Sequence, residues 1–349
     1  MSGGVDSSVT AALLKEQGYH LIGVTMKIWG GKEEGLEPVK HHGCYGPGEE
    51  ADIEDAREVA RSLDIPFHVI DLTREYQSVV LDYFCEEYLS GRTPNPCVRC
   101  NHRIKFNALV EKARDIGLDF DFIASGHYAR IEKNPDSGRY LLKKACDLAK
   151  DQSYFLCFLS QAQLGSLMFP LGGFTKGEVR EMATRFGLQV ADKPDSQNFV
   201  SGEYSSVIKV HGPPGPILDR QGKVLGQHRG LEHYTIGQRK GLEISIGEPV
   251  YVTAIDPSRN AVILGNRNEL QRNEFTASRM NWIATANLSS PAVFTAKIRS
   301  AHKGAEALVS PNADGSVLVK FNQPQMAVSP GQVVVFYQED LVVGGGIID

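Results

Sequence analysis

The sequence has few cysteines, no long apolar run and no strong charge bias. Six cysteines in 349 residues are too few for a disulfide scaffold, so any conspicuous cysteine spacing points to metal or redox chemistry. No apolar stretch reaches the length of a membrane span, and the N-terminus lacks the charged-then-apolar layout of a signal peptide, so we expect a cytoplasmic protein. The net charge of −5 argues against a whole-surface nucleic-acid binder, so RNA binding requires a local basic patch.

The first half of the chain alternates apolar strand patterns with amphipathic helix patterns. The expected strands are 21–29, 66–72 and 120–129, and the expected helices are 51–65, 104–118 and 175–190. This alternation predicts a parallel, doubly wound α/β sheet. After about Tyr204, short β runs are separated by turn residues, as in small barrels or sandwiches. We therefore expect an α/β domain over 1–205, a central β-rich domain over 206–273 and a C-terminal β-barrel domain over 274–349.

Residues 2–8, Ser-Gly-Gly-Val-Asp-Ser-Ser, have the composition of a phosphate-binding loop. Gly3 and Gly4 allow consecutive N–H groups to point into one concavity, and a helix expected from about Val9 to Gln17 directs its positive end there. Asp6 would repel phosphate unless Mg²⁺ bridges the two. A plain glycine turn with helix caps is the alternative, but such a turn has no need of three hydroxyls and an acid together.

The stretch GRTPNPCVRCNHRIKF (91–106) spaces two cysteines, Cys97 and Cys100, as C-x-x-C. Such pairs bind metal, hold a cluster or exchange disulfides. The prolines predict an exposed turn before a helix that begins near Ile104. A thiol at that helix start, close to basic residues, should have a depressed pKa and be a good nucleophile. A structural zinc site needs four ligands, and no second C-x-x-C exists.

Both motifs match known families. Ser-Gly-Gly-x-Asp-Ser resembles the PP-loop of ATP pyrophosphatases. Together with TPNPCVRCN, ASGHYA, KDQSYFL, KPDSQ and YTIGQRKGL, it makes nearly the whole chain resemble the bacterial tRNA-specific 2-thiouridylase family. The resemblance implies that ATP adenylates the C2 oxygen of the wobble uridine and that protein-bound sulfur displaces AMP. We accordingly expect ATP and Mg²⁺ as cofactors, tRNA and a sulfur donor as partners, no membrane, and a monomer.

The resemblance also assigns site residues by matching positions. The residues implied for ATP are Ser2, Gly3, Gly4, Val5, Asp6, Ser7 and Ser8 at the phosphates and Met26 and Gly126 at the nucleoside. The residues implied for tRNA are Asn95, Pro96, Cys97, His127, Lys150, Asp151, Gln152, Arg299, Ser300 and Gln332. Cys100 matches the family nucleophile, and Ser300 replaces an aromatic residue. The plainer alternatives are that His127 ends a strand and that Lys150 is a solvated charge.

The cysteines depart from the family pattern. The stretch KPDSQNFVSGEY has no cysteine where the family commonly has a second catalytic one, and Cys97 stands where Asp is commonest. Two ways of delivering sulfur without the missing cysteine remain open. Cys97 and Cys100 could share a persulfide relay, or they could join a third cysteine in holding an iron–sulfur cluster with one open iron. Cys44 is the best third ligand, because it follows a strand whose C-terminal end faces the ligand crevice. The remaining cysteines, Cys85, Cys146 and Cys157, are expected to be buried and inert.

No strand pattern precedes the phosphate loop. The strand before such a loop lies centrally in this sheet type, so its two neighbours should be separated by about 4.8 Å of extra sheet width. We therefore expect the native start to lie upstream of Met1.

Two other functions remain open. Another adenylating PP-loop synthetase would not need TPNPCVRCN or the β-rich tail. A non-catalytic tRNA-binding or sulfur-carrier protein would have no use for Asp6 and the loop hydroxyls.

Overall fold

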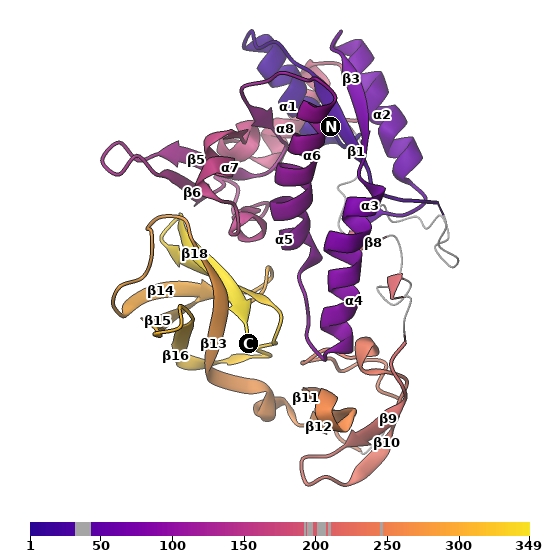
Figure 1. Cartoon of the computed structure of the whole chain (residues 1–349), viewed down its shortest axis with the longest axis vertical. Coiled ribbons are helices and arrows are strands. Elements are labelled where there is room, and N and C mark those ends of the chain that lie inside the picture. Colours follow the sequence, from indigo (N-terminus) through magenta and orange to yellow (C-terminus); the bar gives the residue numbers. More distant parts are fainter. Residues whose placement is uncertain (32–42, 192, 194–197, 201–206, 209–210, 245–246) are drawn as a thin grey trace. The chain divides into compact units, whose positions relative to one another are not determined.

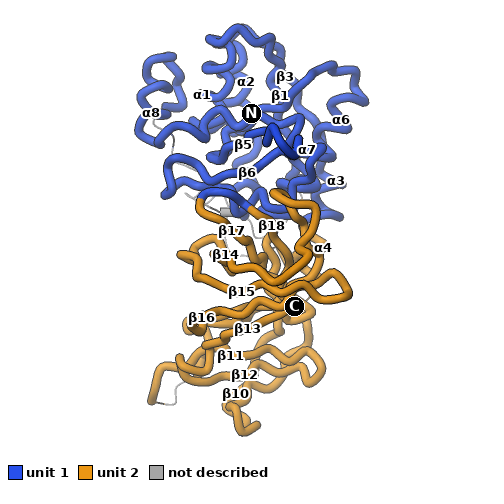
Figure 2. Tube along the Cα trace, turned by 90° about the vertical axis from the view of Figure 1, so that its left-hand side faces the viewer, with its two compact units in different colours: residues 1–80, 97–206, 340–342 blue, residues 81–96, 207–339, 343–349 orange. Residues whose placement is uncertain are grey.

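The structure is a computed structural model that describes residues 1–31, 43–191, 193, 198–200, 207–208, 211–244 and 247–349 (Figure 1). The chain forms two compact units, drawn in different colours in Figure 2. Unit 1 comprises residues 1–80, 97–206 and 340–342, and unit 2 comprises residues 81–96, 207–339 and 343–349. No helix within the described ranges combines the length and apolarity that crossing a membrane demands.

Unit 1 is built from short parallel strand pairs and the helices that pack on them. Its helices are α1 (Val5–Glu16), α2 (Glu49–Ser62), α3 (Thr73–Tyr76), α5 (Pro96–Cys100), α6 (Leu109–Asp115), α7 (Gln161–Gly165) and α8 (Lys176–Arg185). Its strands are β1 (Gly23–Lys27), β2 (Gly43–Tyr45), β3 (Phe67–Asp71), β4 (Ile123–Ala124), β5 (Ala129–Lys133), β6 (Tyr140–Lys144), β7 (Leu167–Met168) and β8 (Asn198–Val200).

The α/β sheet of unit 1 is parallel, as predicted, and interrupted. β1 pairs with β3 in register from Gly23↔Phe67 to Lys27↔Asp71. β4 pairs with β7, and β2 pairs with β8, each in parallel. Among the described residues no strand joins the β1–β3 pair to the β4–β7 pair. The strand expected over 120–129 was wrong for most of its length, because only Ile123 and Ala124 pair before the β5–β6 hairpin begins.

The core of unit 1 fixes α1 in place. Val5, Val9 and Ala12 are buried and recur at helical spacing, so they form one apolar stripe. They share a hydrophobic cluster with Val179 and Ala183 of α8. The helix expected over 175–190 is observed as α8, which begins after a capping box at Thr175. This packing holds the N-terminus of α1, and therefore the loop before it, in one position.

Unit 2 contains a six-stranded barrel and a four-stranded sheet. The barrel order is β13-β16-β15-β14-β17-β18, closed by pairing of β13 with β18. Its strands are β13 (Gln271–Trp282), β14 (Ala292–Lys297), β15 (Ala305–Pro311), β16 (Val317–Met326), β17 (Val333–Gln338) and β18 (Leu341–Ile348), whose residues 341–342 fall in unit 1. The other sheet has the order β10-β9-β12-β11. Its strands are β9 (Gly215–Leu218), β10 (Val224–His228), β11 (Tyr251–Asp256) and β12 (Ala261–Gly265), and α4 (Asp82–Leu89) also belongs to this unit.

Alternation of side chains explains the barrel. In β16, Val317, Val319 and Phe321 are buried, whereas Leu318 and Lys320 between them are exposed, as a strand with one face on a core requires. The predicted β-rich second half is therefore confirmed. The expected boundary near 205 lies outside the described residues, and the one near 273 falls at the start of β13, so the three-domain division stays a prediction.

Candidate active site

Residues 2–4 lead directly into α1, and the rest of the expected loop, residues 5–8, forms the first turn of that helix. Gly3 has a φ of +67°, and a Cβ there would lie 2.3 Å from the carbonyl oxygen of Asp52, so only glycine fits. Helix α1 begins at Val5 with Gly4 as its N-cap residue, four residues before the expected start at Val9. The first-turn N–H groups have no partner within the helix, and together with the helix dipole they make this end an anion site.

The three loop hydroxyls have different surroundings. Ser2 and Ser7 lie side by side, with 3.2 Å between their Oγ atoms, and the Ser2 backbone N–H donates to Ser7 Oγ at 3.0 Å. Ser8 is buried, and its hydroxyl donates to the Gly4 carbonyl oxygen at 2.8 Å. Ser7 Oγ donates to the same carbonyl oxygen at 3.2 Å. Ser2 is exposed and Ser7 is half-buried, so both can meet a ligand, whereas the buried Ser8 can only shape the loop.

A cavity of about 790 Å³ opens beside this loop, within unit 1. Its walls come from α1, from β1 and from the chain around β4. The cavity brings together the expected ATP residues Ser2, Gly4, Val5, Asp6, Ser7, Met26 and Gly126. Gly3 and Ser8 are not on its wall. A volume of this size is within the usual range for cofactor and nucleotide sites.

Gly126 lies where the chain after β4 passes the phosphate loop. A Cβ at this position would sit 2.7 Å from the carbonyl carbon of Asp6 and 2.9 Å from the backbone nitrogen of Ser7. Backbone atoms on a packed helix cannot move aside as a flexible side chain can. Glycine at this position therefore allows the loop and the chain after β4 to make contact.

Replacing Gly126 with alanine should displace the phosphate loop. We expect Gly126→Ala to lower the free energy of unfolding by about 1–3 kcal/mol, the usual cost of overpacking, and to weaken ATP binding at least tenfold. Denaturant unfolding and calorimetric ATP titration measure the two effects. Gly173→Ala is the matched control, because nothing lies within 4 Å of its added Cβ. Equal ATP affinity in the two variants would contradict the close-approach explanation.

Asp6 points its carboxylate at two partners. Tyr128 Oη donates to Asp6 Oδ1 at 2.8 Å, and Lys176 Nζ contacts the same oxygen at 2.7 Å. The Lys176 side chain is only 12% exposed, so this ion pair is shielded from water. Lys176 comes from the first turn of α8, 170 residues away in the sequence, and sequence analysis did not single it out.

Lys193 is a second cation that sequence analysis missed. Its Nζ lies 2.6 Å from both Asp52 Oδ1 and Asp55 Oδ2, and it donates to the Gly3 carbonyl oxygen at 3.2 Å. Burial acts to lower the pKa of Lys193, but hydrogen bonds to the two carboxylates raise it overall. Lys193 thus ties α2 to the phosphate loop. Its place in KPDSQ was the only indication that the sequence offered.

Cys97 and Cys100 lie in a helix, so the expectation of an exposed turn before a helix starting near Ile104 was wrong. Helix α5 begins at Pro96 and runs through a wider, π-helical segment (Asn101–Ala108) into α6, which ends at Asp115. Proline is favoured at a first helical position, where its missing N–H leaves no bond unmade. Cys100 is buried and Cys97 is half-buried.

The prediction of a depressed thiol pKa was also wrong. Burial raises the pKa of Cys97 to about 11 and that of Cys100 to about 12. The Lys105 ammonium opposes both shifts and Cys44 adds to both, which places these groups in one neighbourhood of unit 1. Desolvation outweighs the nearby positive charge because burial penalises the thiolate form.

Cys44 is exposed and lines the cavity, whereas Cys97 and Cys100 do not line it, so its role as a third ligand stays a prediction. Among the described residues, the three sulfur atoms do not form a group with all ligand atoms within 4.8 Å of one another. The arrangement therefore does not match a single tightly held ion. A cluster, in which each cysteine binds a different iron atom, spaces its ligands more widely.

The other cysteines are only partly as expected. Cys157 is fully buried, and burial raises the pKa of its thiol above the ordinary value. Cys85 is half-buried, and its thiol lies 3.6 Å from the Val207 carbonyl oxygen. Cys146 is exposed, so its expected burial was wrong. It lies two residues after the end of β6, in a bend of the chain.

Some of the expected tRNA residues of unit 1 line the same cavity, and Cys97 does not. His127, Lys150 and Gln152 line it, and Asp151 does not. His127 Nδ1 lies 2.8 Å from Ser125 Oγ, and burial lowers the pKa of His127 to about 3, so the ring is neutral at physiological pH.

The two residues after Lys150 hold the local chain. Gln152 Oε1 accepts the Tyr128 N–H at 2.9 Å. Asp151 Oδ1 accepts the backbone N–H groups of Ala145 and Ser153 at 3.1 and 3.2 Å. Both side chains therefore hold neighbouring backbone segments in place by accepting their N–H groups.

The remaining expected tRNA residues belong to unit 2, whereas the residues that line the cavity belong to unit 1. Asn95 and Pro96 end the segment 81–96, whose Thr93 N–H donates to the Pro330 carbonyl oxygen of the barrel at 2.7 Å. Gln332 lies two residues after Pro330 in the same loop of the barrel. Arg299 Nη1 donates to the Met326 carbonyl oxygen at 3.0 Å. Ser300, beside Arg299, lies in the turn after β14.

Three family models match the chain in succession. The tRNA methyl transferase HUP domain matches residues 1–201, the tRNA methyl transferase PRC-barrel domain matches residues 206–266, and the aminomethyltransferase beta-barrel domain matches residues 272–348. The first match contains the phosphate loop, the cavity and the C-x-x-C helix.

Curated proteins are similar over the full length. The tRNA-specific 2-thiouridylase MnmA of Moorella thermoacetica is 49% identical over 356 residues, which cover 100% of this chain and 98% of the relative. The protein of the same name from Acetivibrio thermocellus is 47% identical over 355 residues, which cover 100% of this chain and 97% of the relative.

Proposed function

We propose how this chain, which belongs to the tRNA-specific 2-thiouridylase family, modifies tRNA: it replaces the C2 oxygen of the wobble uridine with sulfur. The C2 oxygen attacks the α-phosphate of ATP, the α–β phosphate bond breaks and pyrophosphate leaves. Sulfide-level sulfur held by the protein then bonds to C2 as its bond to the protein breaks. The C2–O bond breaks, and its electron pair leaves with AMP. The observation that carries this proposal is one cavity whose wall holds both the phosphate loop and Cys44.

The residues on the cavity wall suit ATP as a substrate. The first-turn N–H groups of α1 and the hydroxyls of Ser2 and Ser7 supply donors for phosphate oxygens. Met26 and Gly126 line the cavity and are proposed to contact the nucleoside. Lys193 on the same wall adds positive charge, and Lys176, which is not on the wall, pairs with Asp6. Holding charged phosphates among fixed donors is the main means by which proteins assist phosphoryl and adenylyl transfer.

Asp6 fits Mg²⁺ as the carboxylate ligand of the site. Mg²⁺ is usually held by one or two carboxylates together with substrate phosphates, and Asp6 lies on the cavity wall in the phosphate loop. When bound, Mg²⁺ supplies charge stabilisation of the departing pyrophosphate. Lys176 and Tyr128 orient the carboxylate for this role through their contacts with Oδ1.

For sulfur delivery we favour Cys44, Cys97 and Cys100 as ligands of an iron–sulfur cluster. A free thiol with a pKa of about 11 is only about one part in ten thousand thiolate at pH 7, which disfavours a relay of free thiols. Coordination to a metal deprotonates a thiol outright, so the raised pKa values are compatible with ligands. Cys44, Cys97 and Cys100 would hold the cluster, which when bound would supply sulfide-level sulfur for the reaction at C2.

The partners follow from the substrate. We propose that tRNA reaches the cavity of unit 1 and contacts Lys150 and His127 there, while Asn95, Gln332 and Arg299 supply contacts from unit 2. A sulfur-donor protein or free sulfide replenishes the sulfur. We further propose a cytoplasmic monomer with three domains, 1–205, 206–273 and 274–349; the three successive family matches support this division.

The proposal is tested by incubating the full chain with unmodified tRNA, ATP, Mg²⁺ and sulfide under anaerobic conditions. Digestion of the tRNA and mass spectrometry of its nucleosides should reveal 2-thiouridine, and a reaction without ATP should yield none. AMP formation without thiouridine would instead indicate another adenylating synthetase. Absence of both products would support the non-catalytic alternative.

A further inference from the structure

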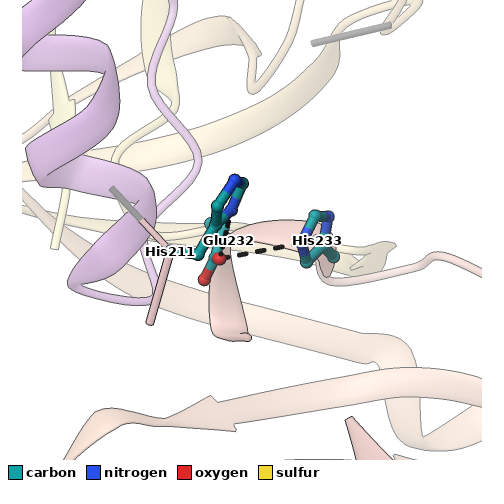
Figure 3. Close-up of side chains that lie close together, drawn as sticks. All are labelled: His211, Glu232 and His233. Atoms are coloured by element: carbon teal, nitrogen blue, oxygen red, sulfur yellow. Dashed lines mark hydrogen bonds and ion pairs between the residues drawn. The ribbon is translucent and has the colours of Figure 1, made fainter. Parts of the chain in front are cut away.

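Two histidines and one glutamate converge within unit 2. His211 precedes β9, and Glu232 and His233 lie in a short helical turn (Leu231–His233). Figure 3 shows dashed contacts from Glu232 to both imidazole rings. His211 Nδ1 lies 3.3 Å and His233 Nε2 lies 3.6 Å from Glu232 Oε1. One ligand atom from each residue falls within 4.8 Å of the other two.

The Glu232 carboxylate is buried and incompletely satisfied. Its side chain is 0% exposed, and Oε2 has no hydrogen-bond partner among the described residues. Oε1 accepts the Gly212 N–H at 3.1 Å. A buried carboxylate oxygen without a partner is costly unless a cation or donor meets it. Protonating one histidine would balance the charge, but both imidazoles contact Oε1. Oε2 would be met only by a cation that both carboxylate oxygens bind.

The backbone makes room for this carboxylate. A Cβ on Gly230 would lie 2.4 Å from Glu232 Oε1 and 2.5 Å from Oε2, and Gly230 has a φ of +143°. Glycine is required at Gly230 because the carboxylate occupies the space of a side chain. The carboxylate is therefore held in place rather than free to rotate toward solvent.

We propose that His211, Glu232 and His233 form a binding site for a divalent transition-metal ion of the zinc class. Two imidazoles and one carboxylate are a donor set that Zn²⁺ takes with a fourth position left open. Tetrahedral bonds of about 2.1 Å place neighbouring ligand atoms about 3.4 Å apart, close to the two observed contacts. The nitrogen donors exclude Mg²⁺ and Ca²⁺, which prefer oxygen ligands.

The geometry gives the ion an entry path and a structural effect. His211 is 57% exposed, whereas His233 is 17% exposed, so an ion can arrive from the His211 side. The two rings are nearly parallel, with an interplanar angle of 12° and centroids 5.8 Å apart. A bound ion would connect His211 to the turn before Tyr234 and so close a loop between His211 and Glu232, which are 21 positions apart in the sequence.

Zn²⁺ titration of the full chain tests this site. The titration uses the Cys44→Ser/Cys97→Ser/Cys100→Ser background, so that these thiols do not compete, after EDTA treatment and buffer exchange. We expect one Zn²⁺ to bind per chain by calorimetry and the melting temperature to rise on binding. His211→Ala, an exposed position that should not impair folding, should weaken binding at least tenfold. Glu232→Gln, which keeps the shape of the side chain, should do the same.

His302→Ala is the matched control, because His302 is a histidine of the same unit that hydrogen-bonds Gln325. Its Zn²⁺ affinity should equal that of the background. Co²⁺ offers a second readout, since its visible spectrum reports coordination by these side chains and should be lost in His211→Ala. A background protein that binds no Zn²⁺ at micromolar concentration would overturn the proposal, as would equal binding in Glu232→Gln.

Discussion

Pyrophosphate release by the Asp6→Asn variant should fall about a hundredfold or more, the scale of losing a preorganised electrostatic group. Asparagine keeps the size of Asp6 and can still accept the Tyr128 hydroxyl, but it removes the charge that Mg²⁺ and Lys176 share. We expect the loss in kcat, with ATP affinity reduced less. Initial rates of pyrophosphate release with tRNA and sulfide present measure the effect.

Two controls separate chemistry from folding in this experiment. Asp136→Asn makes the same change in the exposed turn of the β5–β6 hairpin and should leave the rate unchanged. Thermal unfolding of Asp6→Asn reports any cost of losing the ion pair with Lys176. Near-normal pyrophosphate release by a folded Asp6→Asn protein would remove Asp6 from the mechanism.

The tight turn at Gly3 and the helix that follows it could be predicted because the information is local. Two glycines, three hydroxyls and one acid lie within seven residues, and the conformational freedom of glycine is a property of the residue itself. The site around the loop could not be predicted in the same way. Lys176 reaches Asp6 only because α8 packs on α1, and Lys193 reaches Asp52 only because α2 approaches the loop. The partners in each ion pair are far apart in the sequence, so no short stretch of sequence contains both.

The thiols show a similar limit. From the sequence, Cys97 and Cys100 stood near arginine and lysine, and local charge predicted easily ionised thiols. In the fold, Arg99 donates its Nε–H to the Val79 carbonyl oxygen at 3.1 Å, and Cys100 is buried. Burial is a property of the tertiary structure, and here it outweighs the local charge.

Strand patterns were most reliable where one face of a sheet is covered. The alternation in β16 and the short runs of β11 and β12 follow directly from side chains facing a core. The stretch 120–129 was wrongly predicted to be one strand, because its residues take part in three different structures. Ile123 and Ala124 pair with β7, Gly126 lies against the phosphate loop, and Ala129 starts the β5–β6 hairpin.

Thiolation by the Cys100→Ser variant should fall on the order of a thousandfold or more, as expected for loss of a residue that carries the reacting group. Serine keeps the shape of the buried side chain but neither bears a persulfide nor binds iron as a thiolate does. ATP-dependent pyrophosphate release should change far less, because Cys100 is not on the wall of the ATP cavity. Cys146→Ser, at an exposed cysteine outside this group, is the matched control and should be fully active.

Comparing Cys44→Ser with Cys100→Ser decides between a cluster and a persulfide relay. If Cys44, Cys97 and Cys100 hold a cluster, anaerobically purified protein is brown and contains iron and sulfide, and each of the three serine variants loses both the colour and thiolation. A relay through Cys97 and Cys100 instead gives a colourless protein, active in air with a persulfide donor, in which Cys44→Ser changes little. The raised thiol pKa values favour the first result, because iron coordination stabilises a thiolate that burial otherwise disfavours. Full thiolation by Cys100→Ser would exclude both routes.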